Sequence, residues 1–478
     1  ASIKGSLAEN ILTILKISTK QDIAKTPTSN TEAYKYYLEA KYIYNKRENM
    51  KDTEIARGLL KKTIELDDNL LNAKVFLGKT HYTTGDYDKA MDIFTASLIE
   101  AEEIDDKNLI GNILNKIGLV YKKTGNYNNA IEHFNRSYIL SQKIGNKYRV
   151  GNALNNIGSI YLSKGDYNKA LDNYNLALNI RKEIGSRIGI SNSLNGIGLV
   201  YLNKGDYDKA LDYLTRGLII REQLINLSRI GKSLNNIGIT YSKKGEYEKA
   251  KDYYIRSLKI REQLGEKNGI SNVLFNLGHH YSRKGDYDEA LNYFKKSYKI
   301  KNEIGAIGSQ INLLRIGWIY YTIGDYNKAL EYYNRELRIR QELKDKSGIS
   351  NYFINMGLVY FQQEDYNKAV ENLDKSATMQ MELDSTITLE TLSHLFLSKK
   401  ILGKEYNVSE IHTLIKEEDE IEDYINFALF KLLEDTSYLE TAYNQVQEKA
   451  DNLEPDVAAK FLSYPIPAAI VEEWEKVK

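Results

Sequence analysis

The sequence predicts an all-α protein, built as a curved solenoid of stacked helical hairpins. A glycine recurs at a spacing of 40 residues, with one step of 39, and the residues around it recur with it. Fixed-period self-similarity of this kind is typical of repeat proteins. No proline lies between Thr28 and Glu454, so nothing in this stretch forces a helix to break. The aligned glycines are Gly78, Gly118, Gly158, Gly198, Gly238, Gly278, Gly317 and Gly357.

Each repeat predicts a first helix, a turn and a second helix. In the third copy, Leu154 and Tyr161 place apolar side chains at helical spacing, and Gly158 lets a neighbouring helix approach closely. The sequence Lys-Gly-Asp-Tyr that follows is typical of a turn, and its aspartate is a preferred residue for the start of a helix. The second helix buries Ala170 and ends near Gly185, which suits a helix C-cap. One hairpin cannot bury its apolar faces alone, so the hairpins stack on one another.

The recurring pattern Leu-x-x-Ile-Gly-x-x-Tyr, followed by Gly-Asp-Tyr-x-x-Ala, resembles the tetratricopeptide repeat. The unit is about six residues longer than the usual 34. The resemblance covers residues 71–383 in eight copies, and we assign residues 71–385 to this array. It implies a right-handed α-solenoid of stacked helix-turn-helix hairpins with helical end caps. It also implies that the first helix of each hairpin lines the concave wall.

The segments that flank the array differ from the repeats, as end caps do. We expect an N-terminal linker with a short helix at 1–30, and a degenerate first hairpin at 31–70. We expect a degenerate last hairpin at 386–420 and a C-terminal helical cap at 421–478. The opening segment resembles the junction, in bacterial multidomain proteins, between a TolB-like or cyclase-type effector and a C-terminal repeat array. That resemblance implies an effector module upstream of Ala1.

A polar stripe on the first helices is the predicted binding surface. When the aligned glycine is position 8 of its repeat, positions 2, 6, 9 and 13 lie opposite the core positions. Asparagine recurs in this stripe although it is a mediocre helix former. Because an amide both donates and accepts, a ladder of amides suits the backbone of an extended peptide. The alternative is that the amides cap helices or link repeats. The predicted peptide-binding residues are Asn112, Asn152, Asn156, Asn192, Lys232, Asn236, Lys243, Asn272, Asn276, Arg283, Arg315, Asn351 and Asn355.

Position 9 of the same stripe carries apolar residues in five repeats. Spaced apolar groups in a polar groove are typical of side-chain pockets. The alternative is that the curvature of the array lets neighbouring repeats cover them. The predicted apolar groove residues are Leu119, Leu199, Ile239, Trp318 and Leu358.

The distribution of charge predicts an acidic ligand. The net charge is +1, from 66 basic and 65 acidic residues, which argues against a nucleic-acid partner bound through bulk charge. The first fourteen positions of the eight repeats contain no Asp or Glu but 13 Lys or Arg. Such a positive wall favours an acidic peptide or a free carboxylate. Lysines at the last positions have a second explanation, because the helix dipole favours cations at a helix C-terminus.

No motif in the sequence predicts catalysis or a cofactor. The chain has no cysteine, no phosphate-binding loop, no dinucleotide fingerprint and no metal-ligand spacing. The six histidines are scattered, and the adjacent His279 and His280 point about 100° apart on a helix, which does not suit a shared metal. We therefore predict that this chain is not an enzyme and binds no cofactor.

The sequence thus predicts a protein–protein interaction module. Its ligand would be an extended, acidic or carboxylate-bearing peptide, bound in the concave groove by the ladder of asparagines and basic residues. The alternative is a structural or regulatory scaffold that forms a homo-oligomer, or relays to an upstream effector, without a groove ligand. No apolar run approaches the ~18 residues that span a bilayer, and no signal peptide is visible, so we expect no membrane binding and a cytoplasmic location.

Overall fold

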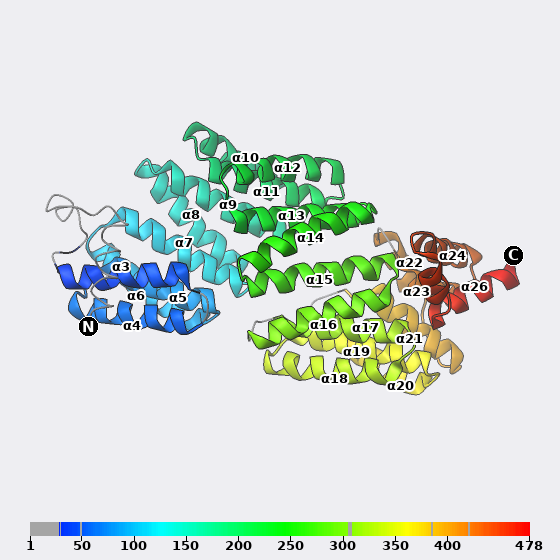
Figure 1. The fold of residues 1–478 in the computed structure, drawn as a ribbon. Helices are drawn as coiled ribbons and strands as arrows, with labels where there is room; N and C mark the ends of the chain where they lie inside the picture. The colour runs from blue at the N-terminus through cyan, green and yellow to red at the C-terminus, as the bar shows by residue number, and fades with distance from the viewer. Residues whose placement is uncertain (1–27, 29, 48–49, 305–307, 384–385, 419–420) are drawn as a thin grey trace. The chain divides into compact units, whose positions relative to one another are not determined.

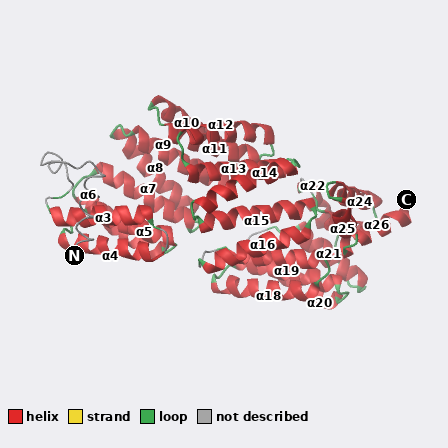
Figure 2. Cartoon of the chain, viewed as in Figure 1, coloured by secondary structure: helices red, strands yellow, loops and turns green. Residues whose placement is uncertain are grey.

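The computed structural model describes residues 28, 30–47, 50–304, 308–383, 386–418 and 421–478. Within these ranges the chain forms 24 helices and no strand, and adjacent helices pack as hairpins (Figure 1, Figure 2). The prediction of an all-α solenoid of stacked hairpins is confirmed. The short helix predicted near the start of the chain lies outside the described residues.

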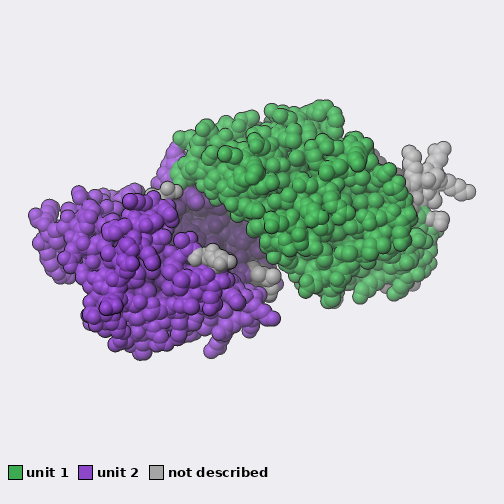
Figure 3. Space-filling view, turned by 180° about the vertical axis from the view of Figure 1, so that it is seen from behind, with its two compact units in different colours: residues 1–236 green, residues 237–478 purple. Residues whose placement is uncertain are grey.

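The chain divides into two compact units, Ala1–Asn236 and Ile237–Lys478 (Figure 3). The boundary falls within helix α13 (Leu227–Lys243). The other helices of the first unit are α3 (Thr31–Lys46), α4 (Met50–Leu66), α5 (Leu71–Thr84), α6 (Tyr87–Glu103), α7 (Lys107–Lys123), α8 (Tyr127–Lys143), α9 (Lys147–Ser163), α10 (Tyr167–Glu183), α11 (Arg187–Asn203) and α12 (Tyr207–Gln223).

The second unit continues the same alternation and ends in shorter helices. Its helices are α14 (Tyr247–Gln263), α15 (Lys267–Lys284), α16 (Tyr287–Glu303), α17 (Ser309–Thr322), α18 (Tyr326–Glu342), α19 (Lys346–Gln362), α20 (Tyr366–Glu382), α21 (Leu389–Ile401), α22 (Ser409–Glu417), α23 (Asp423–Leu433), α24 (Thr436–Asp451), α25 (Pro455–Leu462) and α26 (Pro465–Val477).

The turn inside each hairpin forms as its sequence predicts. Gly165 adopts a positive φ of 76°, a conformation that costs glycine little. The side chain of Asp166 then accepts a hydrogen bond from the backbone N–H of Lys169 at 3.1 Å, which caps the start of α10. The second helix ends at Glu183, and Gly185 follows with a φ of 63°. This geometry confirms the predicted stop near Gly185.

The two helices of a hairpin approach most closely at the aligned glycine. A Cβ atom at Gly118 would lie only 2.7 Å from Cε1 of Phe134, a ring of α8 that is fully buried. Glycine at this position lets the ring lie directly against the backbone of α7. The contact fixes how deeply the second helix packs on the first.

In the first unit, the first helices of the hairpins form the inner layer of the stack. Helix α5 contacts α7, α7 contacts α9, and α9 contacts α11, while the second helices of neighbouring repeats stay further apart. Such an arrangement arises when the stack curves toward the first helices. The predicted polar stripe therefore lies on the inner side of this unit.

The C-terminal helices of the second unit pack back onto earlier repeats. Lys460 forms an ion pair with Asp288 at the start of α16. The ring of Phe461 lies 6.0 Å from that of Tyr287, centroid to centroid. Near Gly324, Pro465 lies close enough that a Cβ atom added to the glycine would come within 2.8 Å of its ring. The last helices thus cover one side of the sixth and seventh repeats.

No helix in the described ranges combines the length and the apolar character needed to cross a membrane.

Replacing Gly118 by alanine tests the close approach within a hairpin. The added methyl group meets the buried ring of Phe134, so we expect the free energy of unfolding to fall by about 1–3 kcal/mol. Gly58 on α4 is the matched control, because a Cβ atom there meets no atom within 4 Å. Gly58→Ala should raise stability by about 0.5–1 kcal/mol. Urea unfolding followed by circular dichroism measures both, and an unchanged midpoint for Gly118→Ala would contradict the packing argument.

Candidate functional site

Amide side chains link the first helices of successive repeats in the first unit. Nδ2 of Asn156 on α9 donates a hydrogen bond to Oδ1 of Asn115 on α7 at 2.8 Å. Nδ2 of Asn236 donates in the same way to Oδ1 of Asn195 at 3.1 Å. These contacts agree with the alternative interpretation of the asparagines, in which their amides link neighbouring repeats. Each bond uses only part of the capacity of an amide, which has two N–H donors and an acceptor oxygen.

Two other predicted amides are held by buried arginines. Arg221 on α12 is 3% exposed, and its Nη2 donates to Oδ1 of Asn192 at 3.3 Å. Nη1 of Arg229 donates to the same oxygen at 2.7 Å. One repeat earlier, Nη2 of Arg181 donates to Oδ1 of Asn152 at 2.9 Å. Asn152 and Asn192 are therefore acceptors within the polar network of the array.

The guanidinium of Arg221 donates hydrogen bonds to neutral oxygen atoms and forms no ion pair with a described carboxylate. Its guanidinium also donates to Oγ of Ser233 at 2.6 Å and to the carbonyl oxygen of Ser191 at 3.3 Å. Burial, followed by the nearby charge of Arg229, lowers the pKa of Arg221 to about 10. The group stays charged at neutral pH, so removing an acceptor such as Asn192 leaves a buried cation with fewer partners.

Two lysines that the sequence prediction left out form the most distinctive charged feature of the first unit. Lys79 on α5 and Lys116 on α7, here called the lysine pair, are partly buried and form no ion pair with any described residue. The ammonium group of Lys79 lies 5.3 Å from the ring centroid of Phe76 and 5.6 Å from that of Tyr44. Lys79 is at position 9 of the first repeat and Lys116 is at position 6 of the second, and these two positions are neighbours on the stripe. The repeat spacing could therefore have identified the lysine pair from the sequence.

The lysine pair is electrostatically strained. Burial, and then the charge of Lys79, lower the pKa of Lys116 to about 8. Burial also lowers the pKa of Lys79, and the charges of Arg47 and Lys41 add to the effect. Nearby, Lys122 donates to Oγ of Ser159 at 2.5 Å. The inner side of the first unit therefore holds several cations that no carboxylate of the described chain neutralises.

The apolar residues of position 9 are less exposed than predicted. Leu119 packs against the core of its own and the following hairpin, and Ile239 packs against the core around Tyr254. Leu199 and Trp318 are also partly buried. Packing by neighbouring repeats, the alternative explanation, accounts for Leu119 and Ile239.

Leu358 corrects one prediction. It is 2% exposed and belongs to a core cluster with Leu392 and Leu395 of α21. Helix α21 packs beside α19 and covers the place where the stripe would continue. The prediction that Leu358 is an exposed groove residue is therefore wrong, because helix α21 packs over it.

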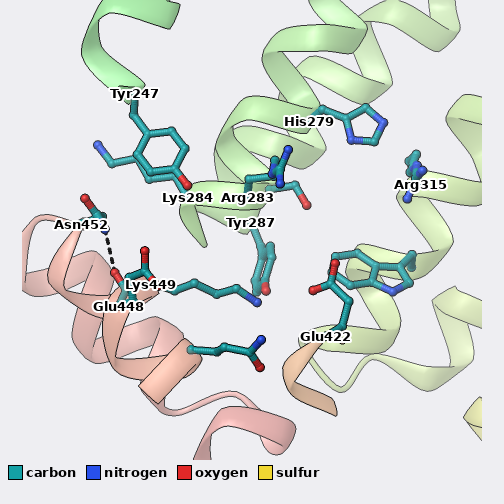
Figure 4. A pocket seen from close by; sticks show the side chains of 13 residues that line it. Tyr247, His279, Arg283, Lys284, Tyr287, Arg315, Glu422, Glu448, Lys449 and Asn452 are labelled. Atoms are coloured by element: carbon teal, nitrogen blue, oxygen red, sulfur yellow. Dashed lines mark hydrogen bonds between the residues drawn. The ribbon is translucent and has the colours of Figure 1, made fainter. Parts of the chain in front are cut away.

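The remaining predicted residues are spread along the array. The exposed ones are Lys232, Lys243, Asn272, Arg283 and Asn351, and the partly buried ones are Asn112, Asn276, Arg315 and Asn355. Arg283 and Arg315 face one cavity of the second unit, together with Trp318 (Figure 4). The cavity has a volume of about 430 Å³, and its opposite wall comes from α24 and from Glu422, just before α23.

The sequence matches the tetratricopeptide repeat family in five overlapping segments that together cover residues 69–303 and in a sixth at 309–382, each spanning about two repeats. These segments make up well over half of the chain. The chain belongs to the tetratricopeptide repeat family. The resemblance drawn from the sequence pattern is thereby confirmed. No curated protein has a sequence that matches this one.

Solved structures of other tetratricopeptide repeat proteins resemble the chain at low sequence identity. A signal transduction ATPase with numerous domains and a tetratricopeptide repeat sensor, from Pyrococcus horikoshii, is 16% identical with a TM-score of 0.51. That match covers 76% of this chain and 54% of the ATPase, so this chain spans about half of that protein's length. It shows the fold alone.

Two further solved structures are similar over most of their own length. A Rap protein complexed with Competence and Sporulation Factor is 18% identical with a TM-score of 0.49, and the match covers 74% of this chain and 99% of that one. The apo form of RapI is 17% identical with a TM-score of 0.47, covering 57% of this chain and 98% of that one.

Replacing single asparagines separates those that hold the repeats together from those that do not. Asn192→Ala removes an acceptor from two arginines, so we expect a loss of about 1–3 kcal/mol in stability. Asn112, at the same repeat position, makes no side-chain hydrogen bond with a described residue. Asn112→Ala should therefore change stability by less than about 0.5 kcal/mol. Urea unfolding compares the two variants, and equal losses would refute the distinction.

The lowered pKa of Lys116 predicts how stability depends on pH. The folded protein releases this proton near pH 8, while the unfolded chain holds it to about pH 10.5. The unfolded state binds more protons between these values, so stability rises with pH across this window. Lys116→Met should remove that part of the rise and stabilise the protein at neutral pH.

The measurement for Lys116 is the free energy of unfolding on both sides of the window, for the wild type and the variant. Lys143→Met is the control, because Lys143 is exposed and forms no ion pair with a described residue. If the free energy of unfolding depends on pH in the same way for Lys116→Met and the wild type, the burial of Lys116 does not cause the rise in stability with pH.

Proposed function

We propose that this chain binds an extended peptide with acidic side chains along the inner stripe of its first unit. As an array of tetratricopeptide repeats, the chain is a protein–protein interaction module. The finer proposal rests on one observation. The lysine pair is partly buried, repels itself and has no carboxylate partner in the described chain.

An acidic side chain of a partner would supply what the lysine pair lacks. A desolvated cation without a counter-ion is costly, whereas a charge-assisted hydrogen bond to a carboxylate is stronger than a neutral one. The rings of Phe76 and Tyr44 beside Lys79 limit the access of water to one side of the site. A bound carboxylate would also restore the ordinary pKa of Lys116, because an opposite charge favours the protonated form.

The amides of the stripe would contact the backbone of the same peptide. Asn156 uses one side-chain N–H for Asn115, and its side-chain oxygen Oδ1 accepts no hydrogen bond from a described residue. That oxygen suits a peptide N–H. Asn152 and Asn192 already accept from arginines through Oδ1, so their free donors are the N–H groups. A ladder of this kind reads the backbone and leaves side-chain selection to the lysines.

We propose that this role involves no catalysis. Among the described residues, no group of three or more His, Asp or Glu is placed to hold a metal ion. The polar groups of the stripe are amides, hydroxyls and cations, which bind and orient a ligand. No carboxylate or free histidine of the stripe stands beside the lysine pair to move a proton.

Loss of peptide binding when the lysine pair is neutralised is the decisive test. Short peptides that differ in their number of glutamates are screened on an array for binding to the wild-type protein. The affinity of the peptide that binds most tightly is then measured by fluorescence polarisation. Lys79→Gln combined with Lys116→Gln should weaken it at least about tenfold, since one charge-assisted bond contributes about 1.5–3 kcal/mol. The affinity of the wild type should fall as salt is added.

The control removes the same charge elsewhere in the first unit. Lys143 on α8 and Lys182 on α10 are exposed and form no ion pair with a described residue. Lys143→Gln combined with Lys182→Gln should keep the affinity of the wild type. If both double variants lose affinity equally, binding depends on net charge alone. If neither loses affinity, the stripe does not bind the peptide, and the alternative of a scaffold without a groove ligand is favoured.

A further inference from the structure

The second unit contains a cavity whose two walls carry opposite charges. One wall is formed by the repeat helices α15 and α17, and the other by α24 and the residue before α23 (Figure 4). Its volume of about 430 Å³ lies in the range of about 300–1,000 Å³ that is typical of small-molecule sites. The cavity belongs wholly to the second unit, so a ligand bound there is independent of the proposed peptide site in the first unit.

The repeat wall is cationic. Arg283 on α15 and Arg315 on α17 face the cavity, and neither forms an ion pair with a described residue. Nε of Arg315 is buried and has no hydrogen-bond partner. His279 lies beside them, but burial, then Arg315 and Arg283, lower its pKa to about 3, so it is neutral. The positive charge of this wall therefore comes from two arginines.

The opposite wall is acidic. Glu422 and Glu448 face the cavity, and the carboxylate of neither one forms an ion pair with a described residue. The two lysines of the cavity are already neutralised by other acids. Lys449 pairs with Asp423 at 2.7 Å, and Lys284 pairs with Glu248 at 3.4 Å. Two guanidinium groups and two carboxylates thus line the same space without an ion-pair partner among the described residues.

An aromatic surface lies at the edge of both walls. Tyr287 is 4% exposed, and its ring centroid lies 6.1 Å from that of Trp318, edge to face. Both rings line the cavity. Aromatic faces of this kind bind apolar and aromatic groups by burial and by stacking.

We propose that this cavity binds a zwitterion of the α-amino acid class, either a free amino acid or a short peptide. The carboxylate of the ligand contacts Arg315 and Arg283, and its ammonium group contacts Glu422 and Glu448. Its side chain lies against Trp318. A simple anion would meet the two glutamates, and a simple cation would meet the two arginines, so only a ligand with both charges satisfies both walls.

Trp318 provides a direct readout. The chain has two tryptophans, and the second, Trp474, stacks on Tyr443, so Trp474→Phe leaves Trp318 as the single reporter. L-phenylalanine and L-alanyl-L-phenylalanine are titrated into this protein. We expect a saturable change in fluorescence with at least one of them, and the tighter of the two distinguishes a free amino acid from a peptide.

Two capped ligands test the two charges separately. N-acetyl-L-phenylalanine lacks the ammonium group, and L-phenylalaninamide lacks the carboxylate. Each should bind at least about tenfold more weakly than the zwitterion, because each leaves one wall unpaired. If all four compounds bind with equal affinity, or if none changes the fluorescence of Trp318, the proposal is overturned.

Variants of each wall complete the test. Arg315→Gln and Glu422→Gln should each weaken the zwitterion at least about tenfold. Lys259→Gln and Glu262→Gln remove the same charges from exposed residues of α14 that form no ion pair with a described residue, and they should leave binding unchanged. Circular dichroism establishes that each variant is folded, and should Arg315→Gln not fold, Glu422→Gln still decides. An affinity that neither wall variant changes would overturn the proposal.

Discussion

The close approach of two helices at one glycine sets the geometry on which the rest of this array depends. At Gly78 and Gly278 the nearest atoms belong to the buried rings of Phe94 and Phe294, which lie where a Cβ atom would otherwise be. Interiors of proteins are close-packed, so a ring that lies directly on a backbone fixes the depth and angle of the second helix. With one side of the first helix buried in this way, its opposite side becomes the stripe.

The side chains of that stripe link the repeats, and we propose that the same side chains also contact a ligand. Neighbouring first helices lie close together, so the polar groups between them need partners, and asparagine supplies a donor and an acceptor without a charge. Oxygens of Asn152 and Asn192 accept hydrogen bonds from the buried cations Arg181 and Arg221. No acid occurs in these positions, and the lysine pair has no counter-ion among the described residues. The same choice of residues thus stabilises the stack and, as we propose, leaves it receptive to an acidic ligand.

The period of the sequence was enough to predict the fold, because each repeat encodes its own turn, cap and glycine. It did not predict the partner of each side chain on the first helices. An arginine recurs 23 residues after the aligned glycine, as Arg181, Arg221, Arg261 and Arg340, and this signal would have exposed the arginine–amide network. The burial of Leu358 and the cavity at Arg315 could not be read from the period. The burial of Leu358 depends on α21, a helix outside the aligned repeats, and the cavity depends on C-terminal helices that fold back onto earlier repeats. Neither kind of packing has a counterpart in a repeating pattern.

The charged groups of the cavity that form no ion pair with a described residue argue for a ligand through their arrangement as well as through their number. Lys284 and Lys449 show that this part of the chain pairs a lysine with an acid where it has one within reach. Burial lowers the pKa of Arg315, and the charge of Glu422 is among those that oppose this fall, yet the two groups form no ion pair. A partly desolvated arginine that lies across a cavity from a carboxylate gains most from a molecule that bonds to both. Because the two groups stand on separate elements, α17 and the start of α23, such a molecule would also stabilise the packing of the C-terminal helices on the repeats.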